Sequence, residues 1–195
     1  MNFSLNENQM MIAQMVRDFA EKEIKPFYKQ WDADEHFPVE TMKKMGELGL
    51  LGIFIPEEYG GSGFSYFEYA TALMELGKVC GGIGLSVAAH NSLCTGHIYY
   101  HGSEEQKMKY LVPLASGQKL GAFCLSEPEA GSDATSQRTL AEDKGDYYLL
   151  NGTKNWITNG SSASVYLVMA QTDPAKGSKG INAFIVEKSW PGVTV

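Results

Sequence analysis

The sequence lacks several features that would assign it to common functional classes. It has no run of basic residues, and 16 Lys and Arg stand against 23 Asp and Glu, for a net charge of −7. Proteins that bind a phosphate backbone need concentrated positive charge, so no nucleic-acid partner is expected. No stretch approaches the roughly 18 consecutive apolar residues of a membrane span. The amino terminus also lacks the basic and apolar regions of a signal peptide, which predicts a soluble, cytoplasmic protein.

Several catalytic and metal-binding motifs are also absent. The chain contains no GxxxxGK[ST] phosphate loop, no HExxH and no GxSxG elbow, and GGIGLSV at 81–87 lacks the third glycine of a dinucleotide-binding fingerprint. His97 and His101 are four residues apart, but no third ligand is placed beside them. The cysteines form no CxxC pair and stand at Cys80, Cys94 and Cys124. The sequence therefore predicts neither a metal site nor a disulfide framework.

Helical patterns fill the chain up to about Ser116. Ser4 and Glu7 have the spacing of a capping box, and apolar residues at helical intervals follow until Pro26. Four more helices are predicted. The second helix begins at Pro38 and stops at Gly49, and the third begins with a capping box of Ser65 and Glu68. The fourth spans 83–100, and the fifth runs from a capping box of Ser103 and Gln106 to Pro113. The stretch 83–100 is apolar on most sides, as expected of a central helix. Residues 50–63 are expected to form a connecting loop.

After Gly117 the pattern becomes extended. Residues 147–150 and 153–158 have the pattern of two strands joined by a type I′ turn at Asn151-Gly152, and 164–172 and 181–187 are two more strands. Helices followed by strands predict an α+β protein with a helical bundle over 1–116 and a small antiparallel, barrel-like β domain over 117–195. The ending PGVTV has the pattern of another strand beginning, so we expect an incomplete β domain with further chain after it.

A loop after a buried strand carries the first indication of a ligand. Residues 124–134, CLSEPEAGSDA, begin as an apolar strand and continue with turn-forming residues. The backbone N–H groups of Ala130, Gly131 and Ser132, with the Ser132 hydroxyl, can form a nest that binds an anion such as phosphate. On its own, a plain connection from strand to turn explains the segment equally well. Glu127 and Asp133 are interpreted as turn and cap residues rather than acid–base catalysts.

A second motif favours the ligand interpretation. In residues 154–159, KNWITN, Trp156 and Thr158 are two apart and would share one face of a strand. Trp156 can then cover one side of a flat ring while Thr158 hydrogen-bonds to the edge of that ring.

These two motifs, in this order and after a helical half, resemble the acyl-CoA dehydrogenase family. The segment SEEQK at 103–107, followed by YLVPLASGQKLGAF, is similar to that family's approach to its flavin signature. The resemblance runs from the first helix to Val195 and is nearest to the short-chain, butyryl-CoA-like branch. It covers the amino-terminal and middle domains and implies that the family's carboxy-terminal four-helix domain is absent from these residues.

The resemblance implies an FAD site and places its residues. The implied cofactor-binding positions are Phe123, Leu125, Ser126, Ser132, Trp156, Ile157 and Thr158. In relatives the position of Ser126 hydrogen-bonds to the isoalloxazine, and that of Ser132 meets the FAD pyrophosphate and the CoA side of the substrate. Trp156 and Thr158 fall where the family packs the flavin edge and hydrogen-bonds near N5.

The implied chemistry is α,β-dehydrogenation of an acyl-CoA thioester to a trans-2-enoyl-CoA in fatty acid β-oxidation. A glutamate removes the α-proton, hydrogen bonds polarise the thioester oxygen, hydride passes to FAD, and electrons pass on to electron-transferring flavoprotein. The family's base lies in the carboxy-terminal domain, so no catalytic residue is assigned here, and residues 1–195 alone are expected to show no turnover. The resemblance also implies a homotetramer for the full-length protein.

Two alternatives stay open at this point. An acyl-CoA oxidase or a flavin monooxygenase of the same superfamily has the same layout but lets oxygen reach the reduced flavin. A non-catalytic folded fragment would keep the motifs with only half of the cofactor site. The branch predicts a short acyl substrate, with the helix that contains residues 86–91 near the end of the acyl cavity.

Overall fold

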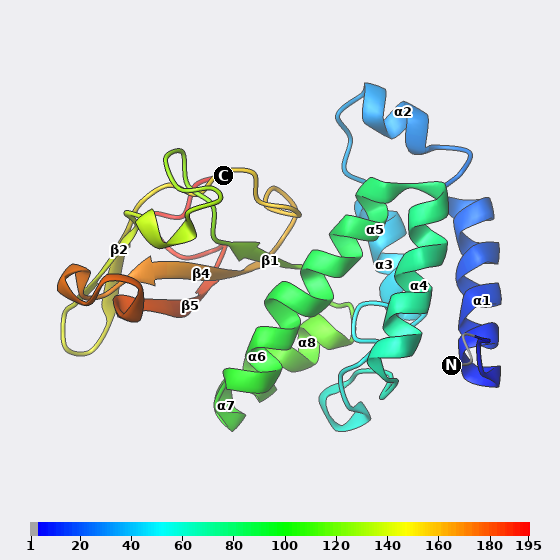
Figure 1. Ribbon diagram of the computed structural model, residues 1–195, viewed down its shortest axis with the longest axis horizontal. Helices are drawn as coiled ribbons and strands as arrows, with labels where there is room; N and C mark the ends of the chain where they lie inside the picture. Colours follow the sequence, from blue (N-terminus) through cyan, green and yellow to red (C-terminus); the bar gives the residue numbers. More distant parts are fainter. Residues whose placement is uncertain (1–3) are drawn as a thin grey trace. The chain divides into compact units, whose positions relative to one another are not determined.

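The computed structural model describes residues 4–195, which divide into two compact units. One unit ends at Leu120 and is helical, and the other spans Gly121–Val195 and is built on a β-sheet (Figure 1). The predicted α+β class, with the helices preceding the strands, is confirmed. None of the described helices is long and apolar enough to cross a membrane.

The helical unit is organised around one long central run. Its elements are α1 (Glu7–Glu23), α2 (Tyr28–Ala33), α3 (Val39–Glu47), the 3-10 turn η1 (Glu57–Tyr59), α4 (Tyr66–Val79), α5 (Gly81–Ala88), the π-helical η2 (Ala89–Thr95), α6 (Gly96–His101), α7 (Glu104–Gln106), the π-helical η3 (Lys107–Leu111) and α8 (Val112–Ala115). The α5–η2–α6 run is continuous and confirms the predicted central helix (Figure 1). Helix α4 packs against both α1 and α5.

Capping boxes begin α1, α4 and α7, and the prediction is correct for the last two and needs a correction for the first. Ser65 with Glu68 caps α4, and Ser103 with Gln106 caps α7. The prediction of Ser4 as the first cap is wrong, because the Asn6 side chain accepts a hydrogen bond from the Gln9 N–H and Gln9 reciprocates. Asn and Ser are about equally effective as N-caps, so the sequence offers two possible caps for this helix. The helix uses Asn6, two residues after Ser4.

Two other helix predictions need correction. Helix α2, which lies between Pro26 and Pro38, was not predicted. The last helix does not stop at Pro113 but continues to Ala115. Just before Pro113 the backbone widens, with the Val112 N–H bonding to the Lys107 carbonyl five residues back. A π-helical turn accommodates a proline ring that an α-helical turn would exclude. The stop at Gly49 is confirmed, with a φ of 74°.

The core of the helical unit includes the connecting loop. The largest fully buried apolar side chains are Ile24, Met45, Leu50, Leu51, Ile53, Ile55, Leu76, Ile98, Leu111 and Leu114. Burying each such side chain contributes roughly 1.5–3 kcal/mol relative to exposure. The loop after α3 is therefore a packed part of the unit, although most of it has no regular helix. Gly46 permits a close approach of two backbones, because a Cβ there would lie 2.9 Å from the Gly117 Cα.

The π-helical part of the central helix contains a buried network of uncharged polar groups. His90 Nε2 lies 2.9 Å from the Leu51 carbonyl and 3.2 Å from that of Leu114. Asn91 donates to the carbonyls of Leu50 and Val87 at 2.8 and 3.1 Å. Burial lowers the pKa of His90 to about 4, although its hydrogen bonds to the two carbonyls oppose this shift. The ring is therefore neutral and ties the central helix to the loop and to α8.

The β unit is arranged around one central strand. Its elements are β1 (Gly121–Cys124), the 3-10 turn η4 (Ala134–Ser136), β2 (Leu140–Asp143), β3 (Tyr148–Asn151), β4 (Val165–Gln171), the 3-10 segment η5 (Pro174–Gly180) and β5 (Ile181–Glu187). Strand β5 pairs antiparallel with all of β4, while β1 pairs parallel with its first half and β2 meets it at Gln171. The predicted strands 164–172 and 181–187 are confirmed as β4 and β5. The sheet is mixed and not antiparallel throughout as predicted, because β1 and β2 both run parallel to β4.

The predicted hairpin at Asn151-Gly152 is wrong. Strand β3 pairs with β2 instead, through a turn in which Gly145 has a φ of 89° and the Lys144 N–H bonds to the Tyr147 carbonyl. Gly152 serves close packing, because a Cβ there would lie 2.3 Å from Thr139 Oγ1. Residues 153–158 form no strand, so Trp156 and Thr158 do not share a strand face.

Candidate functional site

The loop after β1 folds back on itself before it opens. Glu127 and Ala130 exchange backbone hydrogen bonds of 3.0 and 3.1 Å around the turn at Pro128-Glu129. The Ala130 N–H is therefore committed and does not join the predicted nest. The backbone amides of Gly131 and Ser132 and the Ser132 hydroxyl make no hydrogen bond to another described residue. Both residues are exposed, so two amides and one hydroxyl stay open to a ligand.

Asp133 ends this open stretch as a cap. Its carboxylate accepts from the backbone N–H and the hydroxyl of Thr135 at 3.3 and 2.6 Å, and from the Ser136 hydroxyl. These hydrogen bonds, from Ser136 first and then from Thr135, lower the pKa of Asp133. The interpretation of Asp133 as a cap residue is confirmed.

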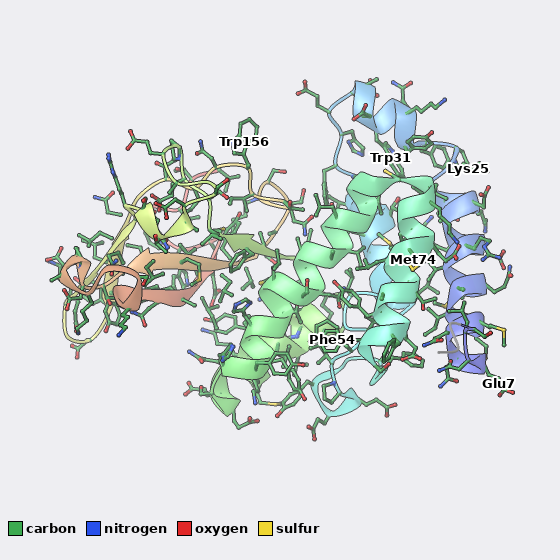
Figure 2. All side chains as sticks on the ribbon, in the orientation of Figure 1. Glu7, Lys25, Trp31, Phe54, Met74 and Trp156 are labelled. Carbon is green, nitrogen blue, oxygen red and sulfur yellow. The ribbon has the colours of Figure 1, made fainter. Side chains whose placement is uncertain are left out.

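The KNWITN motif forms a second loop beside the first. The Asn155 N–H donates to the Ser126 carbonyl at 2.9 Å, which joins the two loops by their backbones. Trp156 follows with a φ of 59°, and its side chain is 93% exposed (Figure 2). A left-handed conformation costs a bulky residue on the order of 1–3 kcal/mol and persists only where the surroundings impose it. An indole without cover in such a position indicates a surface prepared for another molecule.

The remaining predicted positions surround this junction. Phe123 lies in β1 and is half-buried, as are Leu125 and Ser126 in the loop that follows. Ile157 packs against the core of the unit, which contains Ala122, Cys124, Ala163 and Tyr166. Thr158 begins the turn after Trp156, and its hydroxyl and that of Ser126 make no hydrogen bond within the described part of the chain.

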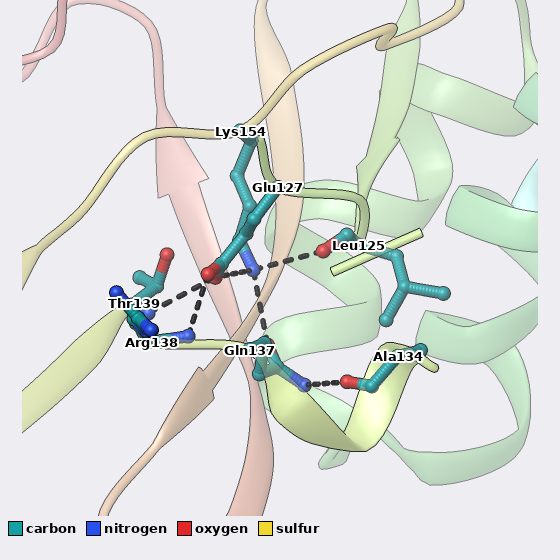
Figure 3. Close-up of polar contacts among 7 residues, drawn as sticks. All are labelled: Leu125, Glu127, Ala134, Gln137, Arg138, Thr139 and Lys154. Carbon is teal, nitrogen blue, oxygen red and sulfur yellow. Dashed lines mark hydrogen bonds and ion pairs between the residues drawn. The ribbon is translucent and has the colours of Figure 1, made fainter. Parts of the chain in front are cut away.

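A buried ion pair holds the two loops together. Lys154 Nζ lies 2.7 Å from Glu127 Oε1, and the side chains are only 9% and 6% exposed. The same ammonium donates to the Leu125 carbonyl and to Gln137 Oε1, each at 3.0 Å (Figure 3). Glu127 also accepts the backbone N–H groups of Arg138 at 2.5 Å and Thr139 at 3.0 Å. Glu127 is thus more than the turn residue predicted for it.

The electrostatics of Glu127 follow from these contacts. Burial alone raises the pKa of a carboxyl group. Here the Arg138 N–H, the Lys154 ammonium and the Thr139 N–H outweigh burial and lower the pKa of Glu127 to about 2. Glu127 is therefore ionised throughout the physiological range and is committed as a hydrogen-bond acceptor, which argues against a role as a general base.

Sequence reasoning missed Lys154, Gln137 and the amides of Arg138 and Thr139. A signal for Lys154 was present, because the first of the two motifs carries only acidic charges and Lys154 is the only charged residue of the second. No comparable signal marks Arg138 and Thr139, since backbone groups do not depend on the side chain at their position.

The thiol of Cys124 is not poised for nucleophilic chemistry. Burial raises the pKa of the Cys124 thiol to about 12, with a small opposing effect of Lys154, so the thiolate form needed for nucleophilic attack is not populated at neutral pH. No group of three or more His, Cys, Asp or Glu side chains between residues 4 and 195 could hold a metal ion.

The junction of the two loops therefore has binding character rather than catalytic character. It presents an exposed indole, the open hydroxyls of Ser126 and Thr158, and the open amides of Gly131 and Ser132. Aromatic rings prefer to stack on flat ligands, and adjacent free amides suit an anion. These groups fit a ligand that combines a planar ring system with a phosphate.

Comparison with known proteins identifies one family for both units. The family model described as "Acyl-CoA dehydrogenase, N-terminal domain" matches residues 6–118, and that described as "Acyl-CoA dehydrogenase, middle domain" matches residues 122–195. The short-chain specific acyl-CoA dehydrogenase of Clostridium acetobutylicum is 50% identical over 195 residues, which are 100% of this chain and 52% of that protein.

Two solved structures share the fold. One is described as electron transferring flavoprotein of Acidaminococcus fermentans; its chain is 49% identical with a TM-score of 0.95, over 98% of this chain and 50% of that one. The other is a glutaryl-CoA dehydrogenase from Mycobacterium smegmatis in complex with FADH2, 40% identical with a TM-score of 0.89, over 96% and 47% of the two chains. The chain thus spans about half the length of the relatives that it matches.

Proposed function

Because this chain belongs to the acyl-CoA dehydrogenase family, with that family's amino-terminal and middle domains, we propose that it is the flavin-binding part of an FAD-dependent acyl-CoA dehydrogenase. The reaction is the oxidation of an acyl-CoA thioester to a trans-2-enoyl-CoA. FAD supplies the hydride acceptor when it is bound. The complex of the related glutaryl-CoA dehydrogenase with FADH2 supports this choice of cofactor.

The residues that would hold FAD are those at the junction of the two loops. Trp156 offers one flat face, and Ser126 and Thr158 offer hydroxyls to the polar edge of the ring. Gly131 and Ser132 offer amides to the pyrophosphate, with Ser132 also turned to the CoA side of the substrate. The set is completed by the apolar side chains of Phe123, Leu125 and Ile157. The exposed, left-handed Trp156 is the single observation that carries the proposal, because it offers an uncovered aromatic face next to open hydroxyls and amides.

The substrate class and the partners follow from the relatives. A short-chain acyl-CoA is the proposed substrate, supported by the short-chain specific relative at 50% identity. Electron-transferring flavoprotein is the proposed electron acceptor, supported by the matching chain in the Acidaminococcus structure. A homotetramer stays a prediction from the family resemblance, and a cytoplasmic location stays a prediction from the sequence.

None of the described carboxylates is assigned as the catalytic base. Glu127 is held in the buried ion pair, and Asp133 caps η4. The contribution proposed for these residues is to bind the flavin, to orient its ring and to fix the pyrophosphate.

The test compares Trp156→Ala with Trp190→Ala, since Trp190 is also exposed, at 43%, but belongs to neither loop. Wild type should bind FAD in a fluorescence titration. Trp156→Ala should weaken binding by about 5- to 30-fold, because stacking on an aromatic ring contributes roughly 1–2 kcal/mol. Its unfolding free energy should stay within about 0.5 kcal/mol of wild type, since the side chain packs against little. Absence of FAD binding by wild type, or equal weakening by both variants, would contradict the proposal.

An assay with butyryl-CoA, made on a protein in which this chain is followed by the family's carboxy-terminal domain, separates the proposed dehydrogenase from an oxidase. Reduction of an artificial acceptor without oxygen consumption supports the dehydrogenase. Rapid oxygen consumption would instead indicate an acyl-CoA oxidase with the same layout.

A further inference from the structure

Lys154 is not among the residues proposed to contact the ligand. All three N–H donors of its ammonium group have acceptors within the protein. An ammonium has three N–H donors. Lys154 has an acceptor for each of them, in the carboxylate of Glu127, the carbonyl of Leu125 and the side chain of Gln137. These acceptors come from the end of β1, the turn after it and the residue after η4 (Figure 3). One side chain from the second loop thus bonds to three separate points along the first loop.

We infer that the buried Lys154–Glu127 pair is a positioning device that sets the flavin-holding loops in their binding arrangement before the ligand arrives. The inference rests on the proposed function and extends it to residues that do not touch the ligand. The ion pair acts by positioning Ser126 and Trp156. Ser126 lies between Leu125 and Glu127 in the sequence, and Trp156 follows Asn155.

The backbone at Trp156 is held on both sides. Before it, Lys154 bonds to Leu125 and the Asn155 N–H bonds to the Ser126 carbonyl at 2.9 Å. After it, the Gly160 N–H bonds to the Ile157 carbonyl at 2.9 Å, and Asn159 Nδ2 reaches the Gly121 carbonyl at 3.3 Å. These anchors supply the constraint that a left-handed tryptophan requires. Without the anchor at Lys154, Trp156 is free to relax to an ordinary conformation.

The first loop depends on the same pair. Glu127 accepts the amides of Arg138 and Thr139, which lie just before β2, while its own backbone closes the turn with Ala130. The residues with open amides, Gly131 and Ser132, therefore directly follow a turn whose backbone is fixed. Because the two charges neutralise each other, the pair provides this order without adding net charge beside an anionic ligand.

The test separates positioning from stability by comparing Lys154→Met with the double variant Glu127→Gln/Lys154→Met. Lys154→Met leaves a buried carboxylate unpaired, so loss of stability accompanies any loss of order. The double variant removes both charges, keeps an acceptor for one of the two amides, and should recover part of the stability. Lys144→Met is the matched control, because Lys144 pairs with Glu142 on the surface of the same unit.

The readouts are FAD affinity and amide hydrogen exchange at Asn155, Arg138 and Thr139 without ligand. Both Lys154 variants should exchange at Asn155 about tenfold faster than wild type, because exchange reports local opening. Both should bind FAD about tenfold more weakly, even where the double variant regains stability, and Lys144→Met should match wild type. A double variant that binds FAD within about twofold of wild type would overturn the inference.

The two proposals fail in different ways. Wild type that binds no FAD refutes the proposed function, and the positioning inference is then decided by exchange alone. Unchanged exchange at Asn155 and Arg138 in both Lys154 variants would refute the positioning role whether or not FAD binds.

Discussion

The two units each contain a buried polar network that joins separate segments of the chain, and the two networks are of different kinds. The helical unit buries His90 and Asn91 as neutral side chains that bond to backbone carbonyls, and both are 0% exposed. The β unit buries a charged pair, Glu127 with Lys154, whose bonds join two loops that follow or precede strands. Neutral groups brace a packed interior at low cost, whereas a buried charge depends on every partner it has.

The difference matches what each network holds in place. The His90 and Asn91 network fastens an apolar loop and a helix end that are themselves part of the core. The Lys154 network fastens exposed loops that have little apolar packing of their own, with open amides, hydroxyls and an uncovered indole. Strong directional contacts replace hydrophobic burial where the surface is left free for a ligand.

The largest effect is expected from Glu127→Ala. The substitution leaves the Lys154 ammonium buried without its counter-charge and leaves two backbone amides without an acceptor. The β unit should lose about 3–5 kcal/mol of unfolding free energy, the usual cost of breaking a buried ion pair. Denaturant unfolding with hydrogen exchange resolved by peptide should show the loss in β1, β2 and β4 and little change in α4. Equal losses in both units would remove the contrast between them.

Acid should separate the two units by pH. The pKa of His90 is lowered to about 4, so its contribution is present above its unfolded pKa of about 6.5 and is lost as the pH falls toward 4. The pKa of Glu127 is lowered to about 2, so its contribution is present above about pH 4.3 and is lost as the pH falls toward 2. Each shift is worth on the order of 3 kcal/mol.

Between about pH 6.5 and 4.5, only the helical unit should therefore lose protection. All four histidines of the chain lie in that unit. Hydrogen exchange at pH 7, 5 and 3 measures this directly. Earlier loss in the β unit than in the helical unit would show that another group controls its acid stability.

A smaller effect is expected from His90→Phe. Phenylalanine fills a similar volume but cannot donate to the carbonyls of Leu51 and Leu114, which would cost about 1–3 kcal/mol for unsatisfied buried acceptors. The loss at neutral pH should come with a weaker dependence on pH between 6.5 and 4, because the titrating group is gone. A variant that keeps the wild-type pH dependence would show that His90 is not its source.

The smallest effect is expected from Ser65→Ala. The Ser65 side chain caps α4, and losing a cap typically costs about 1 kcal/mol. Lys43→Ala, an exposed position in α3, is the control and should change the unfolding free energy by less than about 0.5 kcal/mol. If Ser65→Ala lost more unfolding free energy than His90→Phe, the expected order of these two contributions would be wrong.

Local rules predicted much of the fold and only part of the site. Ser65, Ser103 and Gly49 act through neighbours within a few residues, so their spacing alone identified helix ends. The strands at 164–172 and 181–187 were recognisable because apolar, β-branched runs between turn residues have few other solutions. The hairpin at Asn151-Gly152 failed because a competing turn at Gly145 and the close approach of Thr139 decided the pairing.

The sequence by itself determined the order of helices and strands, the helix caps, and the two motifs that indicate a bound ligand. Each of these features depends on residues that are close together in the chain. Only the tertiary structure decided that Trp156 stands exposed in a left-handed backbone, that the Ala130 amide is committed, and that Lys154 meets Glu127. The contact between Lys154 and Glu127, for example, joins groups that are 27 residues apart. Such contacts form when packing brings distant loops together, and no local periodicity records that packing.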